Sequence, residues 1–221
     1  KGKQPLLNED KSIVLICNGE IYNYIELKKE LLSKGHQFSS DSDSETILHL
    51  YEESGEKCLL RLRGQYSFCL YDTKKRLLFA ARDRIGEKTL YYAQIPEGVV
   101  FSTELKAILK YYIKTPQINL RQLAAPIRYT CPVSKSDTWI EQIKRVEPGQ
   151  YLLANENGIR KYHYWKRNTE TTFTGTIEEA IVRTLALMRE SIDISLRSDV
   201  PIAVMLSGGI DSTAIATLAK E

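Results

Sequence analysis

The chain has 221 residues, which is more than one small core requires and predicts one large domain, or one domain with part of another. Its 31 basic and 28 acidic residues are mixed along the chain and leave a net charge of +3, too little for a surface that binds nucleic acid or anionic membranes. The 43% hydrophobic content is typical of a folded chain, and no apolar run approaches the ~20 residues of a membrane span.

Cysteine usage indicates a reducing environment. The cysteines are widely spaced and form no C-x-x-C pair, so neither a disulfide framework nor a cysteine zinc site is indicated. We expect small buried side chains and a cytoplasmic protein. The cysteines are Cys17, Cys58, Cys69 and Cys131.

A strand and a helix are predicted at the start of the chain. The apolar run 13–17 predicts a buried strand, and the turn-forming pair Asn18-Gly19 is expected to end it. Apolar residues then recur at the helical period across 23–34. Gly35 follows at the position of a left-handed helix cap.

A second helix and a series of strands follow. Ser42 and Glu45 have the spacing of a capping box, and the helix they open is expected to stop at Gly55. Short aromatic and β-branched runs, parted by turn residues, then predict an antiparallel meander. These runs are 65–71, 76–81, 88–93 and 99–102.

The remaining elements of the first part separate helices from strands. A helix opens near Ser102, and Asn119 is expected to cap another that Pro126 kinks or ends. Residues 150–154 and 159–165 read as a hairpin. Segregated helices and strands favour an α+β fold with layered antiparallel sheets.

A polar stretch at 166–176 is the predicted linker to a second domain. Beyond it, 177–196 has one apolar helical stripe, 202–206 reads as a buried strand, and 213–219 as a helix. The segment between that strand and helix, 207–212, reads Ser-Gly-Gly-Ile-Asp-Ser.

This hexapeptide has the character of a phosphate-binding turn. Glycines let the backbone approach an anion, and the amides and dipole of the following helix favour negative charge. No Gly-Lys-Ser/Thr follows, so it is not a Walker loop, and the Ser207 and Ser212 hydroxyls would supply side-chain donors while Asp211 serves Mg²⁺. The alternative is a tight turn with an Asp or Ser cap.

The sequence LSGGIDS at 206–212 resembles the pyrophosphate loop of ATP pyrophosphatases, enzymes that activate a carboxyl or carbonyl group as an adenylate. The resemblance implies phosphate contacts, a Mg²⁺ ligand at Asp211 and adenine near the backbone of Leu206. The implied phosphate contacts are Ser207, Gly208, Gly209 and Ser212.

Earlier segments, in the same order, resemble those of glutamine-hydrolysing asparagine synthetases. They are CNGEIYN (17–23), SDSE (42–45), ARDRIG (81–86), LYY (90–92), FSTELK (101–106), and PG (148–149) with YW (164–165). The resemblance implies an N-terminal-nucleophile hydrolase-like αββα sandwich, then the first helix-strand-loop-helix of an α/β nucleotide-binding domain. The implied domains are a glutaminase at 1–165, a linker at 166–176 and a truncated ATP-pyrophosphatase domain at 177–221.

The resemblance also implies a chemistry for the first domain. An N-terminal cysteine, with its own α-amine as base, attacks the side-chain amide of glutamine. The chain has no such cysteine, and Cys17 lies within an apolar strand, so we expect the nucleophile and a carboxylate-binding arginine upstream of this sequence. Asn18 and the Gly19 amide would form the oxyanion hole, and Glu20 and Asp43, with Asn18, would bind glutamine.

The complete enzyme would convert aspartate, glutamine and ATP into asparagine, glutamate, AMP and pyrophosphate. The implied partners are therefore glutamine, aspartate and ATP with Mg²⁺. No prosthetic group, nucleic acid or membrane is implied, and a homodimer is one possible assembly. The chain as given is expected to be inactive. Glu87 and Thr89 depart from the family's Ile and Pro, which leaves the shape of that loop open.

Two other functions remain. A related amidotransferase would act on another carboxylate or form a β-lactam, and a catalytically silent module would bind neither glutamine nor ATP.

Two groups of residues are interpreted as structural. The Arg82-Asp83-Arg84 triplet is expected to form internal salt bridges, and the scattered His36, His49 and His163 lack metal-ligand spacing.

Overall fold

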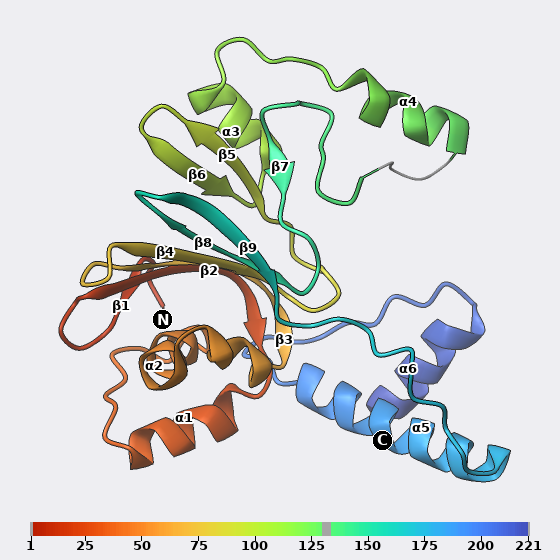
Figure 1. The fold of residues 1–221 in the computed structure, drawn as a ribbon. Coiled ribbons are helices and arrows are strands. Elements are labelled where there is room, and N and C mark those ends of the chain that lie inside the picture. The colour runs from red at the N-terminus through yellow and green to blue at the C-terminus, as the bar shows by residue number, and fades with distance from the viewer. Residues whose placement is uncertain (1, 130–133, 221) are drawn as a thin grey trace. The chain divides into compact units, whose positions relative to one another are not determined.

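The computed structural model describes residues 2–129 and 134–220, so Cys131 lies outside the described residues. The chain divides into two compact units, Lys1–Lys166 and Arg167–Glu221 (Figure 1). No helix among the described residues is both long and apolar enough to cross a membrane.

The first unit contains a six-stranded antiparallel sheet in the order β1-β2-β3-β4-β8-β9. Its strands are β1 Leu6–Leu7, β2 Ile13–Ile21, β3 Gly64–Asp72, β4 Leu77–Arg82, β8 Gln150–Asn155 and β9 Gly158–His163. The predicted turn at Asn18-Gly19 is wrong, because β2 continues through both residues to Ile21. Strand β3 runs opposite them as far as Gly64, and this pairing overrides the local turn preference.

A second sheet of three antiparallel strands has the order β6-β5-β7. Its strands are β5 Tyr91–Ile95, β6 Gly98–Ser102 and β7 Lys144–Arg145. The predicted meander is therefore wrong in one connection. Strand β4 pairs with β8, and the chain leaves the first sheet after Arg82 to begin the second. The hairpin predicted at 150–165 is confirmed as β8 and β9.

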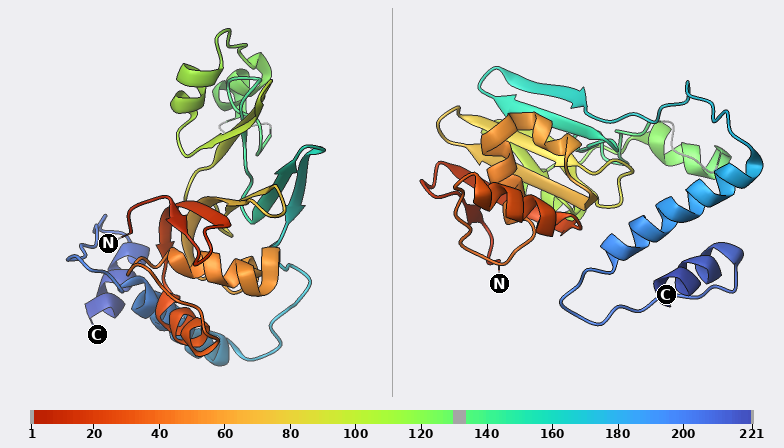
Figure 2. Two further views of the ribbon diagram at one scale, coloured as in Figure 1. Left: turned by 90° about the vertical axis from the view of Figure 1, so that its left-hand side faces the viewer. Right: turned by 90° about the horizontal axis from the view of Figure 1, so that it is seen from below.

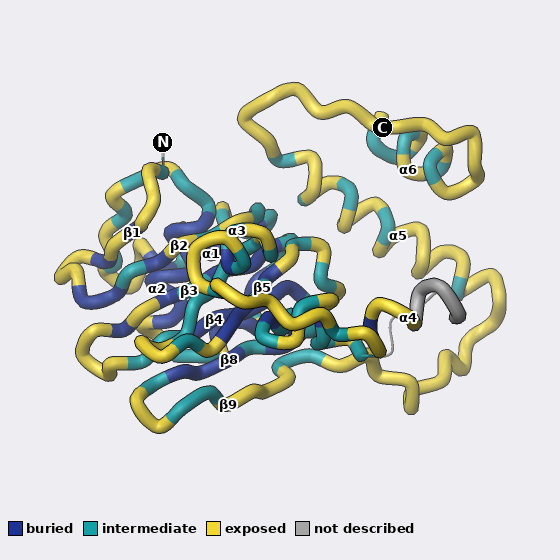
Figure 3. The backbone as a smooth tube through the Cα atoms, turned by 90° about the horizontal axis from the view of Figure 1, so that it is seen from above, coloured by how far each residue is buried: buried dark blue, intermediate teal, exposed yellow. Residues whose placement is uncertain are grey.

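Helices cover both outer faces of the paired sheets (Figure 2). The covering helices are α1 Tyr24–Ser33, α2 Glu45–Ser54 and the 3-10 helix η1 Gly55–Leu60 on the first sheet, and α3 Leu105–Tyr112 on the second. Helix α4 Leu120–Tyr129 follows α3 in the chain. Three apolar clusters lie between the layers. The buried positions of the backbone gather in α2 and the strands of the first sheet (Figure 3). Leu48 and Phe68 join α2 to the first sheet, Leu152 and Tyr92 join the two sheets, and Ile108 joins α3 to the second. This layering confirms the predicted αββα sandwich.

Helix ends show where local signals were correct. Gly35 follows α1 with φ +98°, and His36 N donates to Leu31 O at 3.2 Å, so the predicted glycine cap is confirmed. Asn119 Oδ1 accepts from Gln122 N at 3.0 Å and caps α4, which continues past Pro126 rather than ending there.

The capping box predicted at Ser42 and Glu45 is wrong. The Glu45 carboxylate instead accepts hydrogen bonds from the backbone amides of Ser39 and Ser40, at 2.7 and 2.8 Å, and from their hydroxyls. It is almost completely buried and fixes the loop that precedes α2. Four donors satisfy a buried carboxylate better than one cap bond does.

The second unit is two helices, α5 Ile177–Ser195 and α6 Ile210–Lys220, joined by an irregular segment. Thr176 and Glu179 form a capping box at the start of α5. The strand predicted at 202–206 is wrong: these residues are irregular, and Met205 is 92% exposed. A strand needs a neighbour for its backbone hydrogen bonds, and the described residues of this unit contain no strand to provide one.

Candidate functional site

A cavity of about 260 Å³ lies in the first unit, beside the strand that carries the predicted glutaminase residues. Asn18 and Ser67 line it from the first sheet, and Phe101, Ser102 and Thr103 line it from the end of β6 and the residue after it. Leu90 adds a further apolar wall. The cavity thus combines a few polar groups with apolar walls, as small-molecule sites do.

Asn18 and Ser67 are directly opposite each other in the β2–β3 pair. Opposed residues of an antiparallel pair share one face of the sheet, so both side chains project toward the same space. Asn18 is exposed, whereas Ser67 is only 1% exposed and its Oγ has no hydrogen-bond partner among the described residues. A buried hydroxyl without a partner is costly, which is typical of a site that keeps a polar group for a ligand.

Gly19 occupies a position from which any side chain is excluded. A Cβ there would lie 2.1 Å from Gln65 O and 2.6 Å from Tyr66 Cα. The amides of its neighbours point away from β3, because Cys17 N donates to Gln4 Oε1 at 2.8 Å and Ile21 N to Asp43 Oδ2 at 2.5 Å. Backbone groups alternate along a strand, so the Gly19 N–H points to the same open edge of β2.

Asp43 and Glu20 lie near this edge. Asp43 holds the end of β2 through Ile21 N and precedes α2 by two residues. Glu20 is half-buried on β2, two residues after Asn18. Both carboxylates are close enough to Cys17 to act on its thiol, so the structure brings these predicted residues to one end of β2.

Cys17 is unsuited to nucleophilic attack. Burial raises the pKa of its thiol to about 12, and the negative charges of Asp43 and Glu20 add to this rise. Burial likewise raises the pKa of Cys58 to about 12 and raises the pKa of Cys69. Attack requires the thiolate, so none of these three cysteines supplies a nucleophile near neutral pH.

The loop after β4 is fixed by buried charges that bond to the backbone. One Asp83 oxygen accepts from the amides of residues 85, 86 and 87 at 3.1, 2.6 and 3.0 Å, and the other accepts from Lys88 N at 3.0 Å. Arg82 donates to the carbonyls of Gly86, Lys88 and Val146. The structural role predicted for these residues is confirmed, but their partners are backbone atoms and not the predicted salt bridges.

The two unusual residues in this loop fit its conformation. Thr89 Oγ1 donates to Thr103 O at 2.8 Å, which ties the loop to the cavity wall. Burial and the charge of Asp83 raise the pKa of Glu87. The loop is therefore held by the bonds of Asp83 and Arg82 to its backbone and by the bond from Thr89 to Thr103.

In the second unit, the predicted phosphate loop is held by its own hydroxyls. Ser207 Oγ and Ser212 Oγ are 3.1 Å apart, and Ser207 N donates to Ser212 Oγ at 3.3 Å. Gly208 has φ +80°, a conformation that favours glycine. Helix α6 begins at Ile210, so Asp211 lies in its first turn. Leu206 and residues 207–211 are exposed, and Ser212 is half-buried.

Two histidines were wrongly interpreted as scattered. His36 and His49 lie together, with ring centroids 4.8 Å apart, because the segment after α1 returns to pack on α2. His163 is exposed near Glu147. The 13-residue separation of His36 and His49 gives no local signal of this contact.

The fold and the cavity together define a glutamine amidotransferase domain. A family model described as glutamine amidotransferase domain matches residues 1–165, and one described as asparagine synthase matches residues 183–221. The chain therefore belongs to the glutamine amidotransferase domain family. It is 35% identical over 224 residues to glutamine-hydrolyzing asparagine synthetase 3 of Bacillus subtilis (strain 168), covering 99% of this chain and 36% of that protein.

Two further comparisons extend this result. The chain is 34% identical over 224 residues to amidase chyE of Penicillium rubens, covering 100% of this chain and 32% of that protein. It spans about a third of the length of these curated relatives. The structure of glutamine phosphoribosylpyrophosphate amidotransferase from B. subtilis matches with a TM-score of 0.54 and 19% identity, covering 98% of this chain and 46% of that one, which shows a shared fold.

Proposed function

We propose that residues 1–165 are the glutaminase part of an asparagine synthetase. They would help to release ammonia from the side-chain amide of glutamine, and the whole protein would transfer it to aspartate. The balanced reaction converts aspartate, glutamine, ATP and water into asparagine, glutamate, AMP and pyrophosphate. The single observation that carries this proposal is the exposed Asn18 amide in a cavity, followed by Gly19, whose amide points to the open strand edge.

The oxyanion hole is assigned to the Asn18 side-chain amide and the Gly19 N–H. Attack on the glutamine carboxamide places negative charge on its oxygen, and these uncharged donors would stabilise that charge. Donors fixed before the reaction cost no reorganisation when the charge develops. Gly19 is fixed by strand pairing, and the Asn18 backbone by the ladder to Ser67.

Glu20 and Asp43 are proposed to bind the α-ammonium group of glutamine, with Asn18 as a third contact. Both carboxylates lie at the end of β2 that carries the oxyanion donors. Asp43 Oδ2 already accepts the amide of Ile21, which holds its carboxylate in place, and Oδ1 accepts from Ser44 Oγ at 3.4 Å. Opposite charge would thus select the amino-acid end of the substrate.

The nucleophile is proposed to come from outside the described residues. The raised thiol pKa values exclude Cys17, Cys58 and Cys69 near neutral pH. An N-terminal cysteine whose α-amine serves as base would supply the missing thiolate. Its thiol would add to the carboxamide carbon, ammonia would leave, and water would release glutamate from the thioester.

The second unit is proposed to begin an ATP site. Phosphate would contact Ser207, Gly208, Gly209 and Ser212, Asp211 would serve Mg²⁺, and adenine would lie near Leu206. The exposed hydroxyl pair and the start of α6 support this assignment. Magnesium would enter with ATP as part of the substrate, and no prosthetic group is proposed.

The remaining assignments follow from the same function. Aspartate and glutamine are the small-molecule partners, and the cytoplasm is the proposed compartment, because free thiols persist there. The net charge of +3 supports neither a nucleic-acid partner nor a membrane surface. A homodimer is the proposed assembly. Light scattering of the full-length protein would test it.

The test is a pair of assays on the full-length protein. Glutamate formation from glutamine alone measures the first site, and asparagine with pyrophosphate measures both. We expect both products in the wild type, and loss of glutamine-dependent but not ammonia-dependent asparagine formation in Asn18→Ala. Equal glutamate formation by the variant and the wild type would overturn the assignment of Asn18.

A second candidate is amidation of a different carboxylate, which the similarity to amidase chyE favours, at 34% identity against 35% for the asparagine synthetase. The glutaminase chemistry would be the same, and only the acceptor would differ. Formation of glutamate from glutamine, without formation of asparagine when aspartate and ATP are present, would support this candidate. Titration calorimetry that shows no heat with glutamine or ATP would instead support a silent module.

A further inference from the structure

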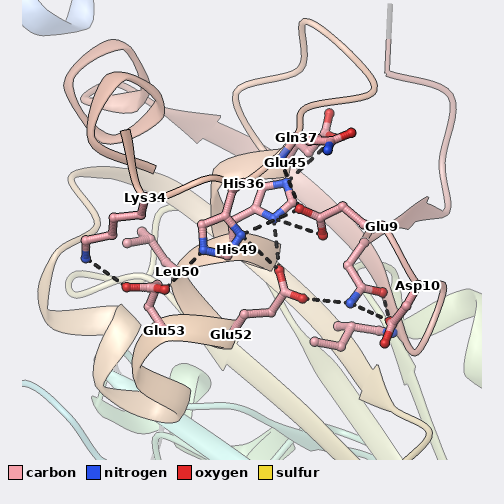
Figure 4. A network of polar contacts seen from close by, with 12 residues as sticks. Glu9, Asp10, Lys34, His36, Gln37, Glu45, His49, Leu50, Glu52 and Glu53 are labelled. Carbon is pink, nitrogen blue, oxygen red and sulfur yellow. Dashed lines mark hydrogen bonds and ion pairs between the residues drawn. The ribbon is translucent and has the colours of Figure 1, made fainter. Parts of the chain in front are cut away.

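Two histidines and two glutamates from three separate segments meet beside α2 (Figure 4). Glu9 comes from the turn between β1 and β2, and His36 from the segment after α1. His49 and Glu52 lie three residues apart on one face of α2. One ligand atom from each of the four residues lies within 4.8 Å of all the others.

The separations of these atoms suit a small cation. His36 Nδ1 is 3.6 Å from Glu9 Oε1 and 3.6 Å from Glu52 Oε2. His49 Nδ1 is 3.7 Å from Glu9 Oε2 and 2.9 Å from Glu52 Oε2. Ligands about 2.0–2.1 Å from a tetrahedral zinc ion lie roughly 3.3–3.5 Å from one another. The four separations above, 2.9 to 3.7 Å, lie near that range.

Other residues hold these groups in the orientation that binding requires. Glu53 Oε1 is 3.1 Å from His36 Nε2, so the outer ring nitrogen has a carboxylate partner. Asn8 Nδ2 donates to Glu52 Oε1 at 2.7 Å, and Gln37 N donates to Glu9 Oε1 at 2.9 Å. Partners of this kind orient the ligands in known metal sites.

Burial and charge also favour a cation. The His49 side chain is fully buried, with Nδ1 toward the carboxylates of Glu9 and Glu52 and Nε2 3.9 Å from Glu45 Oε1. The His36 side chain is 14% exposed. The carboxylates of Glu9, Glu52 and Glu53 converge here, and Lys34 pairs with Glu53 at 2.8 Å. A divalent ion would offset this concentration of negative charge.

We propose that Glu9, His36, His49 and Glu52 bind one divalent transition-metal ion of the zinc class. Imidazole and carboxylate ligands suit Zn²⁺ and Co²⁺, and four protein ligands define a closed, structural site. The ion would tie the β1–β2 turn and the segment after α1 to α2. It would take no part in glutamine chemistry, so its test uses metal binding and not activity.

The first experiment is titration of the full-length protein with Zn²⁺ after chelation and dialysis. We expect one ion per chain, with affinity reduced at least tenfold in Glu9→Gln, which changes a turn residue, and lost in His36→Gln. Glu53→Gln should weaken binding roughly tenfold to a hundredfold. The matched control is His163→Gln, which removes a histidine near a single carboxylate, Glu147, and should leave the affinity unchanged.

The second experiment does not depend on variants that fold. Co²⁺ added to the metal-free wild type should give the intense visible absorption of a four-coordinate site, and X-ray absorption should detect two imidazole ligands. Absence of stoichiometric Zn²⁺ binding, a six-coordinate all-oxygen Co²⁺ spectrum, or equal losses in His36→Gln and His163→Gln would each overturn the proposal. The cluster would then be a hydrogen-bonded network only.

Discussion

Asn18 on β2 and Ser67 on β3 stand opposite each other and contribute an exposed amide and a buried hydroxyl to one wall of the same cavity. The wall is polar at this pair, whereas Leu90 and Phe101 make another part of the lining apolar. A carboxamide with a short apolar stem fits such a lining. Under the proposed function, the pair would lie beside the reactive end of glutamine.

Replacement of Asn18 tests the oxyanion assignment. Asn18→Ala should lower kcat for glutamine hydrolysis by about 10²- to 10³-fold, because one donor to the developing charge is lost. The side chain is exposed, so the free energy of unfolding should change by less than about 0.5 kcal/mol. Steady-state kinetics and urea denaturation measure the two effects. Asn157→Ala, in the exposed β8–β9 turn, is the matched control and should change neither.

Ser67→Ala should have opposite effects on stability and activity. Removal of a buried hydroxyl without a partner should stabilise the fold by about 1 kcal/mol, which raises Tm by roughly 2–4 °C. If the hydroxyl contacts glutamine, KM should rise. Calorimetry and glutaminase kinetics compare the variant with Ser102→Ala, at the half-exposed end of β6. A lower Tm in Ser67→Ala would show that the hydroxyl is satisfied in solution.

Gly19→Ala should destabilise the first unit through a direct clash. The new Cβ would meet Gln65 O at 2.1 Å, so β2 and β3 must separate locally at a cost of about 2–4 kcal/mol. Gly98→Ala is a close control, because its φ of +143° resembles the +154° of Gly19 but no atom lies within 4 Å of its Cβ. Urea denaturation should show a clearly larger loss for Gly19→Ala. Equal losses would mean that backbone conformation, and not the clash, decides the cost.

Asp72 should make stability depend on acidity. Burial alone would raise the pKa of this carboxyl, but hydrogen bonds from Lys75 N and the Lys75 ammonium outweigh it, and the pKa falls below 3.8. A depressed carboxyl pKa adds stability that is present above pH 3.8 and is lost as the pH falls through the folded-state value. Asp72→Asn should thus cost about 1–2 kcal/mol at pH 7, and much less under strongly acidic conditions. Asp41→Asn, on an exposed side chain, is the matched control.

Local signals in the sequence predicted the elements that depend on local contacts. The cap at Gly35, the Asn119 cap and the β8–β9 hairpin are of this kind, since neighbouring residues decide them. Motif order predicted the αββα layers and placed Asn18 at a cavity. The continuation of β2 through Gly19 could not be predicted, because it depends on pairing with a strand that begins at Gly64.

Long-range contacts explain the other differences. The bonds from Ser39 and Ser40 to Glu45 compete with a cap that the sequence favours. The contact between His36 and His49 depends on how the segment after α1 returns to α2. No pattern in the sequence marked Ser67 as a site residue, because its role depends on its burial and its position opposite Asn18. Periodicity carries no information on such distant partners.

The thiol pKa values of Cys17 and Cys58 are both raised to about 12, so thiol-directed reagents should label these two cysteines very little. Alkylating reagents and glutamine-like electrophiles at mildly alkaline pH should modify these side chains, and that of Cys69, only slowly. If a longer form of the protein takes up such a reagent rapidly, the modified thiol would therefore be that of Cys131 or of a cysteine in another part of the polypeptide. Peptide mapping by mass spectrometry then identifies the reactive centre without any mutation.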